Sequence, residues 1–217
     1  MKLLDALLDL LYPPRCAFCR RLLEPEVRPC VCRFCRAKLP RLGPDEQRRG
    51  LPQLELVLAP LRYEGAVRES LHRYKFGGAT LYAAVYAEFL AKCIDENHIS
   101  CDSITWVPLS RRRLRQRGYD QSRLLAEELA KRLQLPCETT LIKRRHTRPQ
   151  SGLHKAAQRR ANAAGAYACP DAERVRGKRL LLVDDIVTTG ATLSECAKVL
   201  RENGCAAVVG AAAASRL

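Results

Sequence analysis

Residues 180–193 constrain the fold of this chain more than any other segment. A run of apolar residues is followed by Asp184 and Asp185, by a short loop with hydroxyl groups and a glycine, and by the start of a helix. The apolar run predicts a buried strand, and open α/β sheets bind ligands at the carboxyl ends of their strands. Two carboxylates can accept hydrogen bonds from neighbouring sugar hydroxyls, and N–H groups at a helix N-terminus bind phosphate. The segment therefore predicts a site for a ribose 5-phosphate.

The loop supplies the phosphate half of this prediction. At Gly190 a side chain would obstruct the close approach of a phosphate to the backbone. A solvated turn with a helix cap is the simpler alternative, but the carboxylates and the loop lie together within the nine residues from Asp184 to Thr192. The expected loop contacts are Val187, Thr188, Thr189, Gly190, Ala191 and Thr192.

Residues 180–193 resemble the phosphoribosyl pyrophosphate (PRPP) loop of type I phosphoribosyltransferases. The resemblance implies that Asp184 and Asp185 hold the 2′- and 3′-hydroxyls of ribose, and that the loop from Thr188 to Thr192 holds the 5′-phosphate. Family members that salvage 6-oxopurines carry an Asp where this chain has Thr188, and a Lys where it has Ala191. The resemblance therefore does not extend to purine salvage.

The cysteines cluster near the N-terminus. Of 11 cysteines, five fall within residues 16–35, and two Cys-x2-Cys pairs lie about a dozen residues apart. This spacing is typical of a tetrahedral, structural zinc site, and it predicts the ligands Cys16, Cys19, Cys32 and Cys35. Cys30 is either a spare thiol or an alternative ligand paired with Cys35. Reduced cysteines without a metal are the simpler alternative, and a redox pair is disfavoured because no βαβ pattern surrounds either pair.

The length of 217 residues suits one catalytic-size domain and a small appendage. Residues 1–50 are expected to form an N-terminal helix, the zinc knuckle and a polar connector, and residues 51–217 the main domain. No apolar run is long enough to span a bilayer, and no signal peptide is recognised in residues 1–11, so a cytoplasmic protein is expected. The leucines of that segment predict a helix that packs on the body of the protein.

Helices and strands alternate along the main domain. Helices are expected near residues 66–75, 79–96, 121–134 and 191–203, and strands over 54–63, 103–108, 138–143, 179–184 and 205–213. This alternation predicts an α/β fold with a doubly wound, mostly parallel sheet of the type I phosphoribosyltransferase kind, with a small N-terminal zinc-binding subdomain.

The positive charge is concentrated in one part of the chain. Residues 111–160 hold 15 Lys and Arg against four Asp and Glu, out of a net charge of +15 for the whole chain. Two basic runs directly follow predicted strands, so both should emerge beside the Asp184 loop. A pyrophosphate needs only a few of these charges, and the surplus favours a larger anion, single-stranded DNA. The candidate nucleic-acid contacts are Arg112, Arg113, Arg115, Arg117, Lys143, Arg144 and Arg145, with Tyr119 and His146 as candidates for base stacking.

Several motifs in order resemble the ComF competence-protein family. They are Val107–Gln121, Tyr74–Gly78 and the Arg148-x-Gln150 segment, and they lie behind a cysteine-knuckle head that is similar to the family's architecture. The resemblance implies a pyrophosphate loop and a flap over residues 144–162. The implied contacts are Pro108, Leu109, Ser110 and Arg111 in the loop, and Arg148 and Arg160 in the flap.

The family resemblance also implies ligands and partners. PRPP would bring Mg²⁺ with it, and internalised single-stranded DNA and DNA-uptake or recombination proteins would be the partners in natural transformation. A related branch of the family is linked to gluconate uptake. Two hypotheses stay open: a PRPP-binding protein that handles single-stranded DNA, and a phosphoribosyltransferase of nucleotide or small-metabolite metabolism without a DNA role. The acceptor and the catalytic residues are not identifiable from the sequence.

Overall fold

The computed structural model describes residues 13–24, 27, 29–145 and 156–216. The expected helix over residues 1–11 lies outside the described residues. None of the helices in the described part of the chain is both long and apolar enough to cross a membrane.

Six of the described strands form one sheet, in the order β1-β2-β8-β7-β4, with β3 also beside β8. The central strands β7 (Arg179–Val187) and β8 (Ala207–Ser215) are parallel and nine residues long. Strands β2 (Leu56–Leu58) and β3 (Leu61–Arg62) are parallel to β8, and β4 (Ser103–Trp106) is parallel to β7. Central parallel strands are covered on both faces, which explains why β7 and β8 begin with apolar runs instead of alternating residues.

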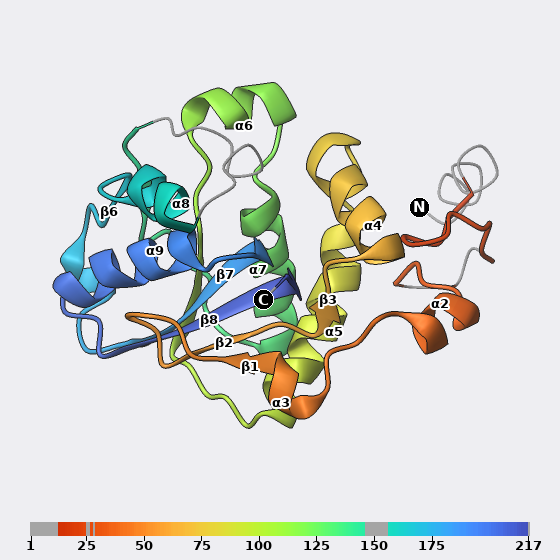
Figure 1. Cartoon of the computed structure of the whole chain (residues 1–217), viewed down its shortest axis with the longest axis horizontal. Coiled ribbons are helices and arrows are strands. Elements are labelled where there is room, and N and C mark those ends of the chain that lie inside the picture. Colours follow the sequence, from red (N-terminus) through yellow and green to blue (C-terminus); the bar gives the residue numbers. More distant parts are fainter. Residues whose placement is uncertain (1–12, 25–26, 28, 146–155, 217) are drawn as a thin grey trace.

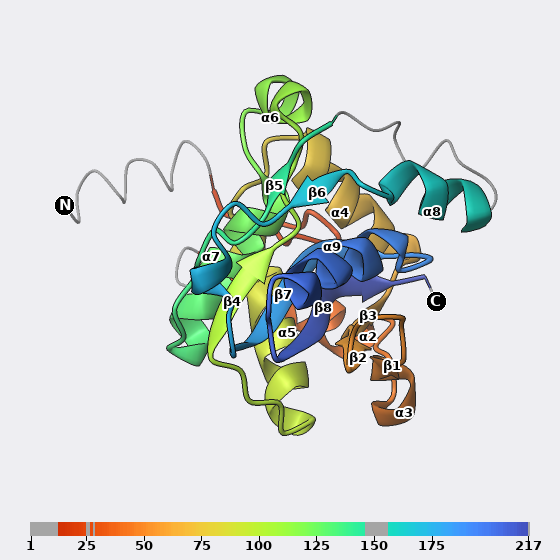
Figure 2. The same ribbon diagram turned by 90° about the vertical axis from the view of Figure 1, so that its left-hand side faces the viewer.

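Helices cover both faces of the sheet (Figures 1 and 2). One face packs under α4 (Gly65–Phe76), α5 (Tyr82–Glu96) and α7 (Gln121–Leu133). The other face packs under α9 (Ala191–Glu202). This arrangement confirms the expected α/β fold with a mostly parallel sheet.

The cysteine knuckle packs directly on α4 and α5. The ring of Phe18 lies edge-on to Tyr86 and Phe89, with centroids 6.1 and 6.2 Å apart. Arg73 of α4 donates hydrogen bonds of 2.9 Å to the carbonyl oxygens of Ala17 and Phe18. The knuckle therefore shares a hydrophobic core with the main domain. The short helix α2 (Arg33–Lys38) carries Cys35 and is part of the knuckle. After it come α3 (Pro44–Gln47) and the antiparallel edge strand β1 (Arg48–Arg49).

Most of the expected elements are present, but the expected strand over residues 138–143 is wrong. After Glu138, whose N–H donates to the Ile104 carbonyl, the chain leaves the main sheet. Only β5 (Ile142–Lys143) is extended, and it pairs antiparallel with β6 (Tyr167–Ala168) in a separate two-stranded sheet. Leu141 of this segment packs into the core beside α9, whereas Ile142 is 42% exposed, so the segment does not extend the sheet edge.

Two α-helices of the main domain were not predicted. Helix α6 (Arg111–Arg117) has no apolar period to reveal it, and it is defined by its ends. The Ser110 hydroxyl accepts from the Arg113 N–H at its start, and Gly118 ends it in the left-handed conformation at φ 78°. Helix α8 (Ala156–Ala163) overlaps the segment expected to be a flap.

Candidate functional site

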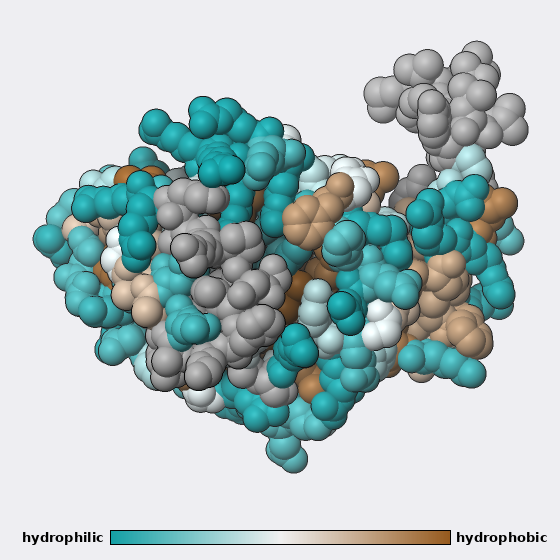
Figure 3. Space-filling model, turned by 45° about the horizontal axis from the view of Figure 1, so that its top comes forward, coloured by the Kyte–Doolittle hydropathy of each residue, from teal (hydrophilic) through white to brown (hydrophobic). Residues whose placement is uncertain are grey.

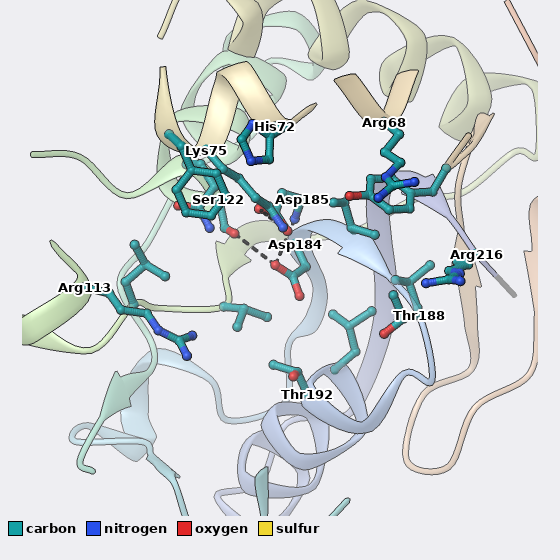
Figure 4. A pocket seen from close by; sticks show the side chains of 18 of the residues that line it. Arg68, His72, Lys75, Arg113, Ser122, Asp184, Asp185, Thr188, Thr192 and Arg216 are labelled. Carbon is teal, nitrogen blue, oxygen red and sulfur yellow. Dashed lines mark hydrogen bonds and ion pairs between the residues drawn. The ribbon is translucent and has the colours of Figure 1, made fainter. Parts of the chain in front are cut away.

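The main cavity of the structure lies at the carboxyl edge of the sheet, and its volume is about 1530 Å³. Its walls come from the ends of β4 and β7, one face of α4, and the N-terminal turns of α7 and α9. Figure 4 shows Asp184 and Asp185 at its centre, with Arg113 on one side and Arg68 and Arg216 on the other. This is the edge at which open α/β sheets bind ligands.

Asp184 and Asp185 are held by different elements. Asp184 Oδ1 accepts hydrogen bonds from Ser122 Oγ of α7 at 3.0 Å and from the Asp185 N–H at 2.8 Å. The Asp185 side chain is only 5% exposed, and its Oδ2 lies 2.9 Å from Lys75 Nζ of α4. Because α4 and the start of α7 meet at this edge, three separate parts of the chain build the diacid site.

Burial and the neighbouring carboxylate disfavour a second negative charge in this site. Together they raise the pKa of Asp184 to about 7, although Lys75 and the hydrogen bond from Ser122 oppose the shift. Near neutral pH Asp184 can therefore act as a hydrogen-bond donor or as an acceptor. Ribose hydroxyls can provide either partner.

The loop after β7 connects the diacid to α9. Val187, Thr188, Gly190, Ala191 and Thr192 line the cavity. Figure 4 places Thr188 and Thr192 below and beside Asp184. Their position at the start of a 12-residue helix is one at which backbone N–H groups bind anions.

Two residues of this loop differ from expectation. Thr189 does not line the cavity, and its buried hydroxyl has no hydrogen-bond partner among the described residues. At Gly190, φ is +72°, and an added Cβ would lie 2.1 Å from Leu51 Cδ1. The structure therefore requires glycine for the left-handed turn and for the close packing of the connector, not because a side chain would enter the phosphate position.

The expected pyrophosphate loop lines the cavity only in part. Pro108 and Leu109 contribute to the wall, whereas Ser110 caps α6 and Arg111 points to solvent. The Leu109 N–H donates to Asp120 Oδ2 at 2.9 Å, and Asp120 also caps α7 through the N–H groups of Ser122 and Arg123. Burial raises the pKa of Asp120. Asp120 therefore fixes the loop to the start of α7.

The structure divides the candidate nucleic-acid contacts into an exposed group and a group in the cavity wall. Arg112, Arg115, Arg144 and Arg145 are exposed, and Figure 3 shows hydrophilic side chains gathered over α6. The candidates that line the cavity are Arg113, Arg117 and Lys143. Burial and the nearby Arg113 charge lower the pKa of Lys143 to about 8.

Of the expected flap contacts, Arg148 lies outside the described residues. Arg160 belongs to α8, but its side chain is not among those described.

Several wall residues were not predicted as site residues. They are Arg68, His72, Lys75, Ser122 and Arg216. Lys75 belongs to the Tyr74–Gly78 motif, so the motif was visible in the sequence although the role was not. The other four carry no local signal.

The four expected cysteine ligands converge. The sulfur atoms of Cys16, Cys19, Cys32 and Cys35 all lie within 4.8 Å of one another, and the Cys19 and Cys32 sulfurs are 3.7 Å apart. A tetrahedral zinc with Zn–S bonds of about 2.3 Å places its sulfurs about 3.8 Å apart. Although burial opposes it, hydrogen bonds from backbone N–H groups, that of Cys32 first, lower the pKa of Cys16 to about 7. The donor set therefore fits a structural zinc ion.

Comparison with known proteins first gives the class. Residues 120–216 match the family model of the phosphoribosyl transferase domain. Among solved structures, a glutamine PRPP amidotransferase from B. subtilis aligns with a TM-score of 0.45 and 23% identity, over 65% of this chain and 30% of that chain. The domain match, the parallel sheet and the site at its carboxyl edge define a phosphoribosyltransferase domain.

Comparison of the whole chain then gives the family. The DNA utilization protein YhgH of Salmonella typhimurium is 31% identical over 199 residues, which are 89% of this chain and 86% of the relative. Competence protein ComFC of Bacillus subtilis is 31% identical over 198 residues, 89% and 74% respectively. Competence protein F of Haemophilus influenzae is 39% identical over 105 residues, so the match spans about half of each chain, 48% and 45%. The chain belongs to the ComF family.

Proposed function

We propose that this chain binds PRPP in the cavity and handles internalised single-stranded DNA during natural transformation. The observation that carries the proposal is the diacid at the end of β7 beside the N-terminus of α9, within a cavity lined by cations on both sides (Figure 4). In this site Asp184 and Asp185 take the ribose hydroxyls. The backbone from Val187 to Thr192 takes the 5′-phosphate.

The pyrophosphate group of PRPP would lie on the Arg113 side of the diacid. There Arg113 lines the cavity beside Pro108 and Leu109, and Asp120 holds Leu109 in place. Mg²⁺ would arrive with PRPP, where it neutralises charge on the diphosphate. Among the described residues the four cysteines are the only cluster of three or more potential metal ligands, so the carboxylates present no cage of their own for Mg²⁺.

The DNA part of the proposal rests on the exposed side of α6. Arg112 and Arg115 are exposed on this helix, whose Arg113 and Arg117 line the cavity. Neither Arg112 nor Arg115 lines the cavity, and the exposed Arg144 and Arg145 add further charge. A row of exposed arginines suits a phosphate backbone, whose binding weakens steeply as salt rises. DNA-uptake or recombination proteins would be the protein partners.

A second candidate is transfer of the phosphoribosyl group to an acceptor, as a phosphoribosyltransferase of metabolism without a DNA role. The size of the cavity favours it, since about 1530 Å³ exceeds the roughly 300–1000 Å³ of a typical single-ligand site. The space beyond PRPP would then hold the acceptor. Release of pyrophosphate from PRPP across a panel of bases and DNA distinguishes turnover from binding alone.

The PRPP site can be tested by calorimetry with PRPP and Mg²⁺. Asp184→Asn with Asp185→Asn removes both carboxyl groups, and we expect binding to be lost. Asp95→Asn with Glu96→Gln also removes two carboxyl groups, at the exposed end of α5 that leads into the start of β4, and should bind as the unmodified chain does. Unchanged affinity in the Asp184/Asp185 variant would refute the assignment of the site.

The DNA site can be tested by fluorescence anisotropy with a labelled single-stranded oligonucleotide at two salt concentrations. Arg112→Glu with Arg115→Glu should weaken binding at least tenfold at low salt and reduce its salt dependence. The matched control is Arg174→Glu with Arg176→Glu, an equal change of charge at the exposed turn before β7. Equal loss in both variants would show a non-specific effect of net charge and would count against α6 as the site.

A further inference from the structure

Phe76 is an exposed aromatic residue at the mouth of the PRPP pocket. It is the last residue of α4, it is 61% exposed, and it lines the cavity that holds the diacid. A single exposed hydrophobic side chain is ordinary on a protein surface. What distinguishes Phe76 is the set of groups around it.

Two flat, charged or chargeable groups lie against the Phe76 ring. The His72 ring, one turn earlier on α4, has its centroid 4.9 Å away. The Arg117 guanidinium of α6 lies over the ring at 4.6 Å from the centroid. Arg117 Nη1 is also held by Gln121 Oε1 at 2.8 Å, so the guanidinium is fixed in this position. The three side chains form a cluster between α4 and α6, in which the His72 and Phe76 rings are tilted by 49° to each other.

From this geometry we infer that Phe76, with His72 and Arg117, is a stacking platform for a nucleobase at the entrance to the PRPP pocket. Aromatic rings and guanidinium planes both stack on bases, whatever the base identity. The platform immediately follows Lys75, which contacts Asp185, so a stacked base would lie at the same pocket as the ribose phosphate. The inference rests on the proposed function, and the nucleobase is the ligand class that connects PRPP binding with DNA binding.

Other aromatic residues near the site are less suited to this role. Tyr119 is partly buried, its hydroxyl donates to the Tyr74 carbonyl, and its ring centroid lies 6.4 Å from that of Tyr74. Tyr167 is 6% exposed and receives a hydrogen bond from Lys143. Of the described phenyl and phenol rings in the cavity wall, Phe76 is the most exposed.

The base could come from a DNA strand or from a free nucleobase, since both present the same π-face. The strand is favoured because Arg117 ends the helix whose exposed Arg112 and Arg115 suit a phosphate backbone. A strand lying along α6 would bring a base to Phe76 without any change in the fold. The chain offers a matched control in Phe34, which is 56% exposed with Lys38 over its ring at 4.7 Å, but which lies on the knuckle outside this cavity.

The test compares a single-stranded oligonucleotide with its abasic counterpart, which has the same phosphates and no bases. We expect the unmodified chain to bind the normal strand about fivefold or more tightly than the abasic strand. Phe76→Ala should abolish that preference, whereas Phe76→Trp and Phe34→Ala should keep it. A 2-aminopurine probe, offered in a strand and as the free base, reports stacking by fluorescence quenching and identifies the source of the base. PRPP binding by calorimetry is measured on the same variants.

The binding preference and the quenching together support or refute the Phe76 platform. A preference for bases that depends on Phe76 supports the platform. Equal binding of normal and abasic strands, with Phe76→Ala unchanged and free 2-aminopurine unquenched, overturns it while leaving salt-dependent DNA binding intact. If the unmodified chain binds no strand at low salt, the DNA part of the proposed function fails, and only Phe76-dependent quenching of the free base would still support the platform. Intact PRPP binding in Phe76→Ala shows that the pocket itself is undisturbed.

Discussion

Lys75 Nζ lies 2.9 Å from Asp185 Oδ2, and this contact joins the end of α4 to the end of β7. Asp185 is 5% exposed and Lys75 is 21% exposed, so the pair is largely screened from water. Removing one partner of a buried ion pair leaves an uncompensated charge, which costs more than the pair itself contributes. The Lys75 charge also offsets that of Asp185, so it reduces the repulsion between the two adjacent carboxylates at this edge of the sheet.

We expect Lys75→Met to lower the free energy of unfolding by up to roughly 3 kcal/mol at pH 8. Adding Asp185→Asn should restore part of the loss, because the unpaired charge is then removed. Urea denaturation of both single variants and the double variant gives the coupling energy. Additive effects in this cycle would contradict the contact.

Asp184 should make stability depend on pH. Its pKa is about 7 in the folded chain, because of burial and Asp185, and about 3.9 in an unfolded chain. A raised pKa in the folded state contributes stability that is fully present below about pH 4 and is lost as pH rises through about 7. Asp184→Asn does not titrate, so the variant should gain stability relative to the unmodified chain over this range. Urea melts from pH 4 to pH 8 measure the difference, and parallel profiles would contradict the shift.

Asp120 should act on PRPP binding by holding Leu109. Asp120→Ala removes acceptors for three backbone N–H groups, so we expect a loss of about 1–2 kcal/mol in stability and a weaker affinity for PRPP. Asp120→Asn keeps one acceptor oxygen, which can serve either the Leu109 N–H or the cap of α7 but not both, so its PRPP affinity should lie between those of the unmodified chain and Asp120→Ala. Asp171→Ala, which removes a similar cap at an exposed turn, is the control. An equal effect of Asp171→Ala on PRPP affinity would show that capping, and not the Leu109 contact, matters.

Gly190→Ala should destabilise the chain for two separable reasons. The left-handed conformation at φ +72° costs about 1–2 kcal/mol for a residue with a Cβ, and the methyl group collides with Leu51. Leu51→Ala in the same chain should remove the collision but not the strain, so stability should recover only in part. Full recovery measured by thermal denaturation would show that backbone strain is absent.

The zinc site should stabilise the whole chain. Because Phe18 packs on Tyr86 and Phe89, loss of the metal should expose part of the main core as well as the knuckle. We expect one zinc per chain by metal analysis, and a lower Tm after chelation or in Cys16→Ser. Cys30→Ser should keep both the metal and the Tm, since Cys30 is not part of the converging cluster. A metal content well below one per chain would refute the site.

The strongest local patterns predicted the fold. The apolar run before Asp184 predicted the central strand β7, and the alternation of elements predicted a mostly parallel sheet. Helix α6 and the departure of residues 138–143 from the sheet were missed. Neither is encoded by an apolar period, since α6 is set by its caps and β5 by its pairing with β6.

The sequence by itself determined the groups that lie close along the chain: the four converging cysteines, the two carboxylates and the loop before α9. Short spacing forces such groups together in any fold that forms the local element. Only the tertiary structure decided that Lys75 faces Asp185, that Arg113 enters the cavity while Arg112 points to solvent, and that Phe76 lies open beside Arg117. These relationships depend on how α4, α6 and α7 pack at one edge of the sheet, and residue spacing carries no record of that packing.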